Sequence, residues 1–571
     1  MNKTHWLALC SAMLLAACQQ NTSTTAVQVQ QQTSTSLHNT AGIAARADAN
    51  RIEAHMLFLA DDALAGRDTG SNGHLIASHY IASQFQQIGL KPAGTDGYLQ
   101  MVPLKQSKLV QSSPKLSFSN NGKTTELAFP KEFMTGPSSH DGTVTHSAGL
   151  VFVGFGLVSK EFGIDDYAGL DVKGKVVVVL PGRPEHLPSE EAAHISSQKA
   201  KLAAERGAVG MITLNTPKDE ARRPFAQGAM YLHMPRMRWL HPDGTAEGDY
   251  PQLKISAALD IPASKQLFSK APQSYEQILA SVEKKQNPKG FALDTTVNFS
   301  RASQHETAES PNVAAVLEGS DPLLKNEYVV VTAHSDHIGV GADLRVKDRI
   351  NNGLMDNAAG VAILLETARL FANAPVKPKR SILFVTVTGE EKGLLGADYF
   401  AHYPTRPTEK LVANVNIDMP VLLYPFADMV AFGANHSTLG DVVAKAAGQY
   451  DVKLAKDPMP EQAIFTRSDH YTLVKQGVPA VFLMTGFTSR DPKQKGGDVW
   501  GKFFAKHYHK ATDDVAGLTK DFGAIRYDYG ALFADINYGI AEQVANDPQR
   551  PLWKKDSFFG KIFGKEYNQA K

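Results

Sequence analysis

The spacing of hydrophobic residues predicts two helices near the start of the folded region and short strands further on. Between residues 48 and 90, Ile52, Met56 and Leu59 recur at helical intervals, and the stretch 79–88 repeats this pattern before Gly89. In the middle of the chain, between residues 142 and 293, uninterrupted apolar runs replace the helical pattern. We expect strands at 150–154, 175–180 and 210–214, and a helix at 199–206.

From residue 312 onward, apolar strands alternate with amphipathic helices. The expected strands are 328–332, 381–387, 413–417 and 479–484, and the expected helices are 358–371 and one beginning at 395–400. This alternation predicts an α/β fold, with a mainly parallel mixed sheet between layers of helices. Ligands of such folds bind at the carboxyl ends of the strands.

The N-terminus reads as a targeting segment. Lys3 precedes an apolar run at 6–17, and Leu15-Ala16-Ala17-Cys18 looks like a bacterial lipobox. We predict a lipoprotein signal peptide at 1–17, membrane attachment through lipidated Cys18, and a flexible Gln/Thr/Ser tether at 18–40. Because Gln19 and not aspartate follows the cysteine, we expect the outer membrane of a Gram-negative-type cell envelope, facing the periplasm. The alternative is an ordinary signal peptide with an incidental cysteine.

Size and charge narrow the function classes. The chain has 571 residues, so two or more domains are expected. The net charge of +1 gives no overall field that would attract nucleic acid, so nucleic-acid binding is not expected. Cys10 and Cys18 are the only cysteines, and a mature chain that begins at Cys18 can form no internal disulfide.

Ionisable residues follow several of the predicted strands. The residues of this set are His334, Asp336, Asp356, Glu390, Glu391, Asp418 and His509. Singly, such residues are common as helix caps and surface groups. Gathered at one edge of a sheet, the carboxylates would repel one another without a cation. Imidazole and carboxylate are ligands that zinc accepts when no thiolate is present.

This set, in this order, resembles that of the zinc-dependent exopeptidases, which include secreted bacterial aminopeptidases and glutamate carboxypeptidases. The N-terminal stretch 64–94 shares the resemblance, and 166–176 and 203–210 resemble the protease-associated domain. The resemblance implies a di-zinc peptidase domain formed by 41–141 and 294–548. It also implies an inserted β-rich protease-associated domain at 142–293 and a C-terminal tail at 549–571.

The resemblance also assigns roles. One zinc ion would be held by His334 and Asp418 and the other by Glu391 and His509, with Asp356 bridging two ions that share a water or hydroxide. Glu390 would be the general base, Asp336 would orient the imidazole of His334, and Tyr508 would donate to the developing oxyanion. Met355 departs from the family pattern, in which an acidic residue often precedes the bridging aspartate.

The predicted substrates are peptides cleaved from the amino end. Carboxylates near the metals suit a free ammonium, whereas a carboxypeptidase needs cations such as arginine, of which Arg467 is one candidate. We place His470 and Phe487 in the substrate pocket. The alternatives are a carboxypeptidase, a glutaminyl cyclase on the same scaffold, or a non-catalytic receptor-like module. The aromatic and lysine-rich stretch 553–563 is expected to pack on the domain, with membrane contact as the alternative. The sequence leaves the oligomeric state open.

Overall fold

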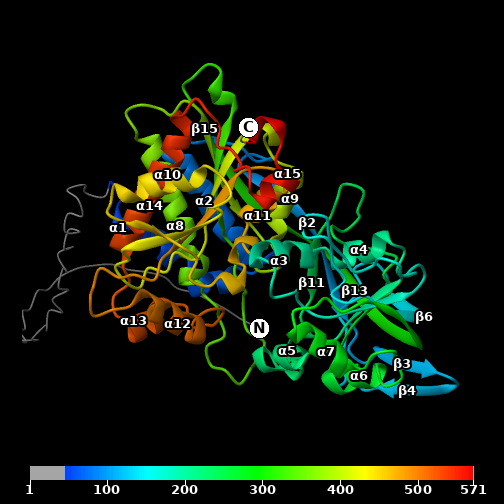
Figure 1. The fold of residues 1–571 in the computed structure, drawn as a ribbon. Helices are drawn as coiled ribbons and strands as arrows, with labels where there is room; N and C mark the ends of the chain where they lie inside the picture. Colours follow the sequence, from blue (N-terminus) through cyan, green and yellow to red (C-terminus); the bar gives the residue numbers. More distant parts are fainter. Residues whose placement is uncertain (1–45, 570–571) are drawn as a thin grey trace, which may run out of the picture. The chain divides into compact units, whose positions relative to one another are not determined.

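The computed structural model describes residues 46–569. The predicted signal peptide, the tether and Cys18 lie outside the described residues. Two sheets share one long strand, β13 (Phe291–Leu317), whose C-terminal half belongs to the first sheet and whose N-terminal half belongs to the second. Figure 1 shows this strand running into the strand-rich block formed by the middle of the chain.

The first sheet has a parallel centre with antiparallel edges. The strand order β15–β14–β16–β19 is parallel throughout, while β13 pairs antiparallel with β15, and β17 pairs antiparallel with β19. The strands are β14 (Tyr328–His334), β15 (Ser381–Val387), β16 (Leu411–Ile417), β17 (Asp428–Phe432), β18 (Lys453–Ala455) and β19 (Ala480–Thr485). The expected parallel sheet is confirmed, because fully buried β-branched strands such as β14 and β15 need cover on both faces.

Helices cover both faces of this sheet. On one face α8 packs against α1 and α14, and on the other the apolar side of α9 and Leu473 of α11 contact Val330 and Leu383 of the strands. The helices of the two layers are α1 (Ala49–Leu59), α2 (Asn72–Ile88), α8 (Ala359–Ala372), α9 (Leu395–His402), α10 (Leu439–Gly448), α11 (His470–Lys475), α12 (Gly496–Lys506), α13 (Val515–Phe522) and α14 (Tyr527–Asn546). Figure 1 shows α1, α8 and α14 side by side.

The second sheet contains the inserted block. Its strands are β3 (Lys115–Asn120), β4 (Lys123–Leu127), β5 (Phe133–Met134), β6 (Thr143–Phe152), β9 (Val176–Val179), β10 (Gly210–Thr213) and β12 (Ile255–Leu259). The small helices are α3 (Ser189–Ser197), α4 (Lys199–Glu205), α5 (Pro217–Arg222), α6 (Ile261–Leu267) and α7 (Tyr275–Glu283).

The boundary predicted at residue 142 lies within this second sheet. β3 pairs with β13 and β4, and β5 pairs with β12, so the strand pairing of the inserted block begins at Lys115. The sequence pattern missed this because β3 and β4 form a half-exposed hairpin with few apolar residues. Strands β2 (Leu99–Leu109) and β11 (Arg236–Trp239) extend the first sheet beyond β13.

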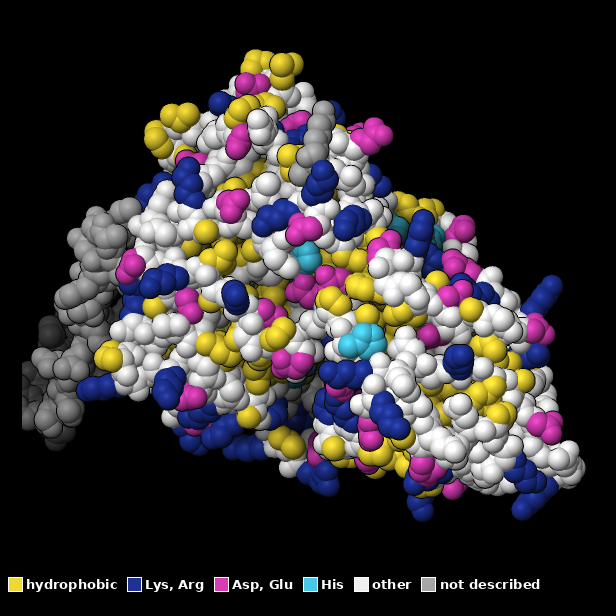
Figure 2. Space-filling model, viewed as in Figure 1, with side chains coloured by type: hydrophobic (Ala, Val, Ile, Leu, Met, Phe, Trp, Pro, Cys, Tyr) yellow, Lys and Arg dark blue, Asp and Glu magenta, His cyan; other side chains and the backbone are white. Residues whose placement is uncertain are grey.

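The C-terminal segment packs on the domain, as expected from its aromatic residues. Trp553 and Phe559 are buried, and Phe559 lies 4.9 Å from Phe465 between ring centroids. Helix α15 (Phe558–Phe563) contacts α11. Among the described residues, every helix is too short or too polar to cross a membrane. Figure 2 shows acidic and basic side chains interspersed on the viewed face.

Candidate metal centre

The parallel strands bring the predicted ligands together at their carboxyl ends. His334 is the last residue of β14, and Asp418 directly follows β16. The Nε2 atom of His334 lies 3.2 Å from Oδ1 of Asp418 and 3.3 Å from Oδ1 of Asp356. Asp356 reaches the same place from η4 (Leu354–Ala358), the turn before α8. These three buried residues form a group with metal-ligand spacing.

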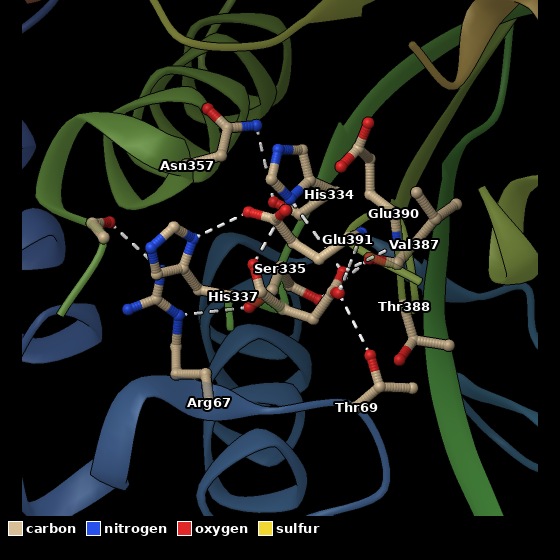
Figure 3. A network of polar contacts seen from close by, with 12 residues as sticks. Arg67, Thr69, His334, Ser335, His337, Asn357, Val387, Thr388, Glu390 and Glu391 are labelled. Carbon is tan, nitrogen blue, oxygen red and sulfur yellow. Dashed lines mark hydrogen bonds and ion pairs between the residues drawn. The ribbon is translucent and has the colours of Figure 1, made fainter. Parts of the chain in front are cut away.

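A second group lies on the other side of Asp356. Oδ2 of Asp356 is 3.3 Å from Nε2 of His509, which is itself 3.0 Å from Oε2 of Glu391. His337 completes the group, with Nδ1 2.8 Å from Oε1 of Glu391 and 3.9 Å from Oδ2 of Asp356. Figure 3 shows His337 and Glu391 facing each other. Asp356 therefore contacts both groups, one through each carboxylate oxygen.

The donor atoms of the second group fit a cation. Both ring nitrogens of His337 and Oε1 of Glu391 are buried and have no hydrogen-bond partner within residues 46–569, although Nδ1 and Oε1 are only 2.8 Å apart. Two polar atoms that lie this close without hydrogen-bond geometry are positioned in the same way as two ligands of one shared ion. Sequence reasoning did not single out His337. Its only signal was its position directly after His334-Ser335-Asp336.

The carboxylate of Asp336 contacts the turn after β15 more closely than it contacts the imidazole of His334. This carboxylate accepts from the backbone N–H of Glu390 at 3.1 Å and of Glu391 at 3.4 Å, and from the hydroxyl of Thr69 at 3.0 Å. Nδ1 of His334 donates to the main-chain carbonyl of Asp336 at 3.2 Å, whereas the carboxylate is 3.9 Å away. Asp336 thereby fixes the turn that carries both glutamates.

Arg67 ties the two ligand-bearing loops to the N-terminal segment. Its guanidinium is fully buried and donates to the carbonyl oxygens of Leu59, Ser335, Asn352 and Gly353. Ser335 follows the ligand His334, and Gly353 precedes η4, so one side chain spans both loops (Figure 3). Arg67 lies in the stretch 64–94 that shares the family resemblance, but its sequence context gave it no role.

Two further side chains hold Asp356 and Asp418 in place. Asp513 accepts from the backbone N–H of Met355 at 3.1 Å and of Asp356 at 3.2 Å. Ser468 donates to Oδ2 of Asp418 at 2.7 Å. These contacts fix the directions of the carboxylates before any ligand arrives.

The electrostatics are those of an acidic site with paired imidazoles. Burial opposes protonation of His509, but Asp356 and Glu391 outweigh it and raise the pKa of His509 to about 10. Burial would raise the pKa of Asp356, but hydrogen bonds to His334 and His509 hold this pKa well below its usual value. In these imidazole–carboxylate pairs, a proton on the imidazole supplies the positive charge that a metal cation would otherwise supply to balance the carboxylates.

Glu390 differs from its neighbour Glu391. Loss of solvation raises the pKa of Glu390 well above its usual value; the nearby carboxylates of Glu391 and Asp418 add to this, and His334 opposes it. Tyr508 stacks on His509 with 3.8 Å between ring centroids, and burial beside the carboxylates raises its pKa, so its hydroxyl stays protonated and able to donate.

The predicted pocket residues fare differently. His470 is fully buried between Phe465 and Phe482, and burial lowers its pKa to about 3. Its place in a substrate pocket stays a prediction. Arg467 is exposed, and Phe487 is partly exposed and packs against Trp500.

Comparison with known proteins agrees with this arrangement. Residues 312–525 match the model of Peptidase family M28. Over 275 residues the chain is 28% identical to leucine aminopeptidase 2 of Trichophyton rubrum, an alignment that covers 45% of this chain and 50% of that protein. Over 258 residues it is 25% identical to the probable leucine aminopeptidase 2 of Aspergillus oryzae, covering 43% of this chain and 48% of that protein. The chain thus spans about half the length of the curated relatives it matches.

Among solved structures, the aminopeptidase from Aneurinibacillus sp. strain AM-1 superimposes with a TM-score of 0.49 at 20% identity, covering 88% of this chain and 95% of that chain. The residues of the candidate metal centre lie within the stretch that matches the model of Peptidase family M28. The match contains Asp356, Glu391, Asp418 and His509, together with the last residues of β13 and all of β14.

Proposed function

We propose that the protein is a zinc aminopeptidase that removes residues from the free amino end of peptides. The observation that carries the proposal is Asp356, whose two oxygens lie 3.3 Å from His334 and 3.3 Å from His509. One carboxylate shared by two imidazole–carboxylate groups is the arrangement expected of a two-ion site. The names of the fungal relatives support the choice of an aminopeptidase.

Two groups of residues would hold the ions. His334, Asp356 and Asp418 form the first; Asp356, Glu391 and His509 form the second, with His337 as an additional donor. Bound zinc would polarise the scissile carbonyl and supply a water of lowered pKa as nucleophile. The buried nitrogens of His337 and the unpaired oxygen of Glu391 support the presence of a cation here.

The remaining chemistry belongs to side chains of this chain. Glu390, whose pKa is raised, would take a proton from the attacking water and return it to the leaving amine. Asp336 holds the backbone N–H of Glu390, which fixes the direction in which this glutamate leaves the strand. Tyr508 would donate its hydroxyl proton to the oxygen that gains negative charge.

A free amino terminus suits the charge of the site. Asp469 is fully buried, and both of its carboxylate oxygens are without a hydrogen-bond partner among the described residues. Burial raises the pKa of Asp469, and the neighbouring carboxylate of Asp418 adds to this effect. A site with this excess of carboxylates favours an ammonium over a terminal carboxylate, whereas Arg467, the candidate for a carboxypeptidase, is exposed.

The test is hydrolysis of matched substrates by metal-free protein titrated with zinc. We expect cleavage of amino-acid anilides with a free amine, none of the N-acetylated equivalents, and full activity at about two zinc equivalents. Glu390→Gln should lose activity about a hundredfold to ten-thousandfold while still binding zinc. Cleavage of N-blocked peptides at the carboxyl end would contradict the aminopeptidase proposal. Zinc binding with no hydrolysis of either set would contradict the enzymatic role.

The cell-envelope location remains a separate proposal. It rests on the lipobox-like sequence that ends at Cys18, which lies outside the described residues. Cys18→Ser should release the protein from the membrane fraction after cell lysis. Unchanged membrane association of this variant would contradict lipid attachment. The proposed protease-associated character of the inserted block likewise rests on sequence resemblance.

A further inference from the structure

A second cluster of metal-ligating side chains lies where the inserted block meets α9. It borders a cavity of about 560 Å³ whose lining includes His241 and Glu247 from the loop after β11, and His402 from α9. One donor atom each of Glu247, Asp398 and His402 lies within 4.8 Å of the others. Asp398 and His402 are one helical turn apart and share a face of α9.

We propose that Glu247, Asp398 and His402 form a peripheral site for a divalent first-row transition metal such as zinc. One imidazole and two carboxylates form a donor set that such ions accept, with water completing the coordination. The site is separate from the catalytic centre and shares no residue with it. It joins two segments, at residues 247 and 398–402, that are distant in sequence.

Each proposed ligand is held by a neighbour, as metal ligands commonly are. The indole N–H of Trp239 donates to Oδ2 of Asp398 at 3.0 Å. His241 is hydrogen-bonded through Nε2 to Glu247 at 2.9 Å and through Nδ1 to the hydroxyl of Tyr403 at 2.8 Å. Nδ1 of His402 donates to the main-chain carbonyl of Asp398 at 2.8 Å, which fixes the ring. Such outer contacts set ligand orientation and basicity.

The local charge leaves room for a cation. Lys475 donates to Oδ1 of Asp398 at 2.7 Å and neutralises one carboxylate. Among the described residues, the carboxylate of Glu247 is hydrogen-bonded to His241 alone, so its charge has no other partner there. Two carboxylates, one ammonium and neutral imidazoles carry a net charge of −1, which a dication would change to +1. The Trp239 ring is tilted against both imidazoles, with its centroid 5.1 Å from that of His402 and 4.4 Å from that of His241.

An ion at this place would tie the inserted block to the catalytic domain. α9 begins at Leu395, four residues after Glu391. The ion would therefore fix the loop after β11 against the helix that follows the two glutamates of the catalytic centre.

The experiment uses Co²⁺ as the probe and tryptophan fluorescence as the signal. Co²⁺ bound beside Trp239 quenches its emission, and Trp239→Phe identifies the part of the signal that comes from this residue. We expect saturable quenching of Trp239 in the metal-free full chain. Glu247→Gln and His402→Gln should each weaken the Co²⁺ affinity of this transition by about tenfold or more. In Asp356→Asn, whose catalytic centre is impaired, the quenching should persist.

His233→Gln is the matched control, because His233 is an exposed histidine of the same inserted block. It should titrate like the unaltered protein. Quenching of Trp239 that is absent in the unaltered chain, or equally strong in Glu247→Gln and His402→Gln, would overturn the peripheral site. Loss of the quenching in Asp356→Asn would also overturn it, because the signal would then report the catalytic centre. Circular dichroism of each variant shows whether it is folded.

Discussion

Both sheets contain buried parallel strands, but the polar residues that follow these strands have different kinds of partner. In the inserted block, β9, β10 and β12 are parallel. Asn215 and Thr216 lie shortly after β10, and Asp260 directly follows β12. Thr216 accepts from the backbone N–H of Asp219, and Asp260 from that of Ala263, so each caps the helix that follows. These side chains are satisfied within a few residues of themselves.

The ends of β14, β15 and β16 show the opposite behaviour. His334, Glu391 and Asp418 turn toward residues far away in sequence, and in the described part of the chain Oε1 of Glu391 and the ring nitrogens of His337 have no hydrogen-bond partner. Strand geometry is the same in the two sheets, so it does not distinguish a structural polar residue from a functional one. The distinction lies in whether the side chain finds its partner locally.

The sharpest test makes the same substitution in both places. Asp356→Asn removes the carboxylate shared by the two metal groups, and we expect activity to fall at least about a thousandfold, equivalent to about 4 kcal/mol of transition-state stabilisation. Asp260→Asn keeps a good helix cap and should leave activity unchanged. The measurement is kcat/KM for an amino-acid anilide together with zinc content. Equal effects of the two variants would contradict the comparison.

The next test concerns two buried cations that bind carbonyl groups. Arg67 donates to carbonyls on both ligand loops, and Lys199 donates to Leu180 and Gly182 in the inserted block at 2.9 and 2.7 Å. Arg67→Met should cost about 3–5 kcal/mol, because several buried carbonyls lose their donor. Urea denaturation measures this cost, and zinc affinity should fall with it.

Lys199→Met is the matched control for Arg67→Met. It should lower the free energy of unfolding by about 1–3 kcal/mol and leave zinc affinity unchanged. Arg67→Lys should recover only part of the loss, because an ammonium cannot reach as many carbonyls as the guanidinium fork. A normal zinc affinity in folded Arg67→Met would show that Arg67 stabilises the fold without positioning the ligands.

Sequence reasoning predicted the strands and helices of the first sheet because these depend on local patterns, whereas the candidate metal ligands were assigned through the family resemblance. β15 was placed at 381–387 and is found at Ser381–Val387, since a buried strand must be an apolar run. The proximity of His334 and Asp418 follows from parallel strands that end at one edge of the sheet, and Asp356 joins them from the turn before α8.

The rest depended on tertiary contacts that no local pattern encodes. The burial of His470 is decided by Phe465 and Phe482, which come from other elements. Asp336 was expected to orient the imidazole of His334, but its carboxylate lies nearer the backbone of Glu390, in the turn after β15. Arg67 reaches the ligand loops across more than 250 residues of sequence. Residues of this kind are found only when the chain is folded.

A smaller effect is expected at the contact between the inserted block and the domain that carries the candidate metal centre. Burial, with a contribution from Lys475, lowers the pKa of His194 to about 4, and its ring is hydrogen-bonded to the hydroxyl of Tyr471 at 2.6 Å. The unfolded chain binds this proton near pH 6.5, whereas the folded chain binds it only near pH 4. Stability therefore falls as the pH drops from about 6.5 to 4, and this contribution is constant above that range.

His194→Gln removes this titration. The slope of unfolding free energy against pH between 4 and 6.5 should decrease by up to about 1.4 kcal/mol per pH unit. Thermal unfolding at constant zinc and ionic strength measures the slope. His79→Gln is the control, because His79 is an exposed histidine and its replacement should leave the slope unchanged. Identical slopes for His194→Gln and the unaltered chain would show that the pKa of His194 is the same in the folded and unfolded chain.

The smallest effect is expected from Asp260→Ala, which tests the structural side of the comparison. The carboxylate of Asp260 accepts from Ala263 N–H at 2.8 Å at the start of α6, and alanine cannot replace this bond. We expect the free energy of unfolding to fall by about 1 kcal/mol, with kcat/KM and zinc content unchanged. Asp260→Asn should recover most of the loss, because asparagine caps helices as well as aspartate does. A drop in activity for folded Asp260→Ala would mean that the strand ends of the inserted block are coupled to the proposed catalytic centre. Local hydrogen bonding would then not distinguish structural polar residues from functional ones.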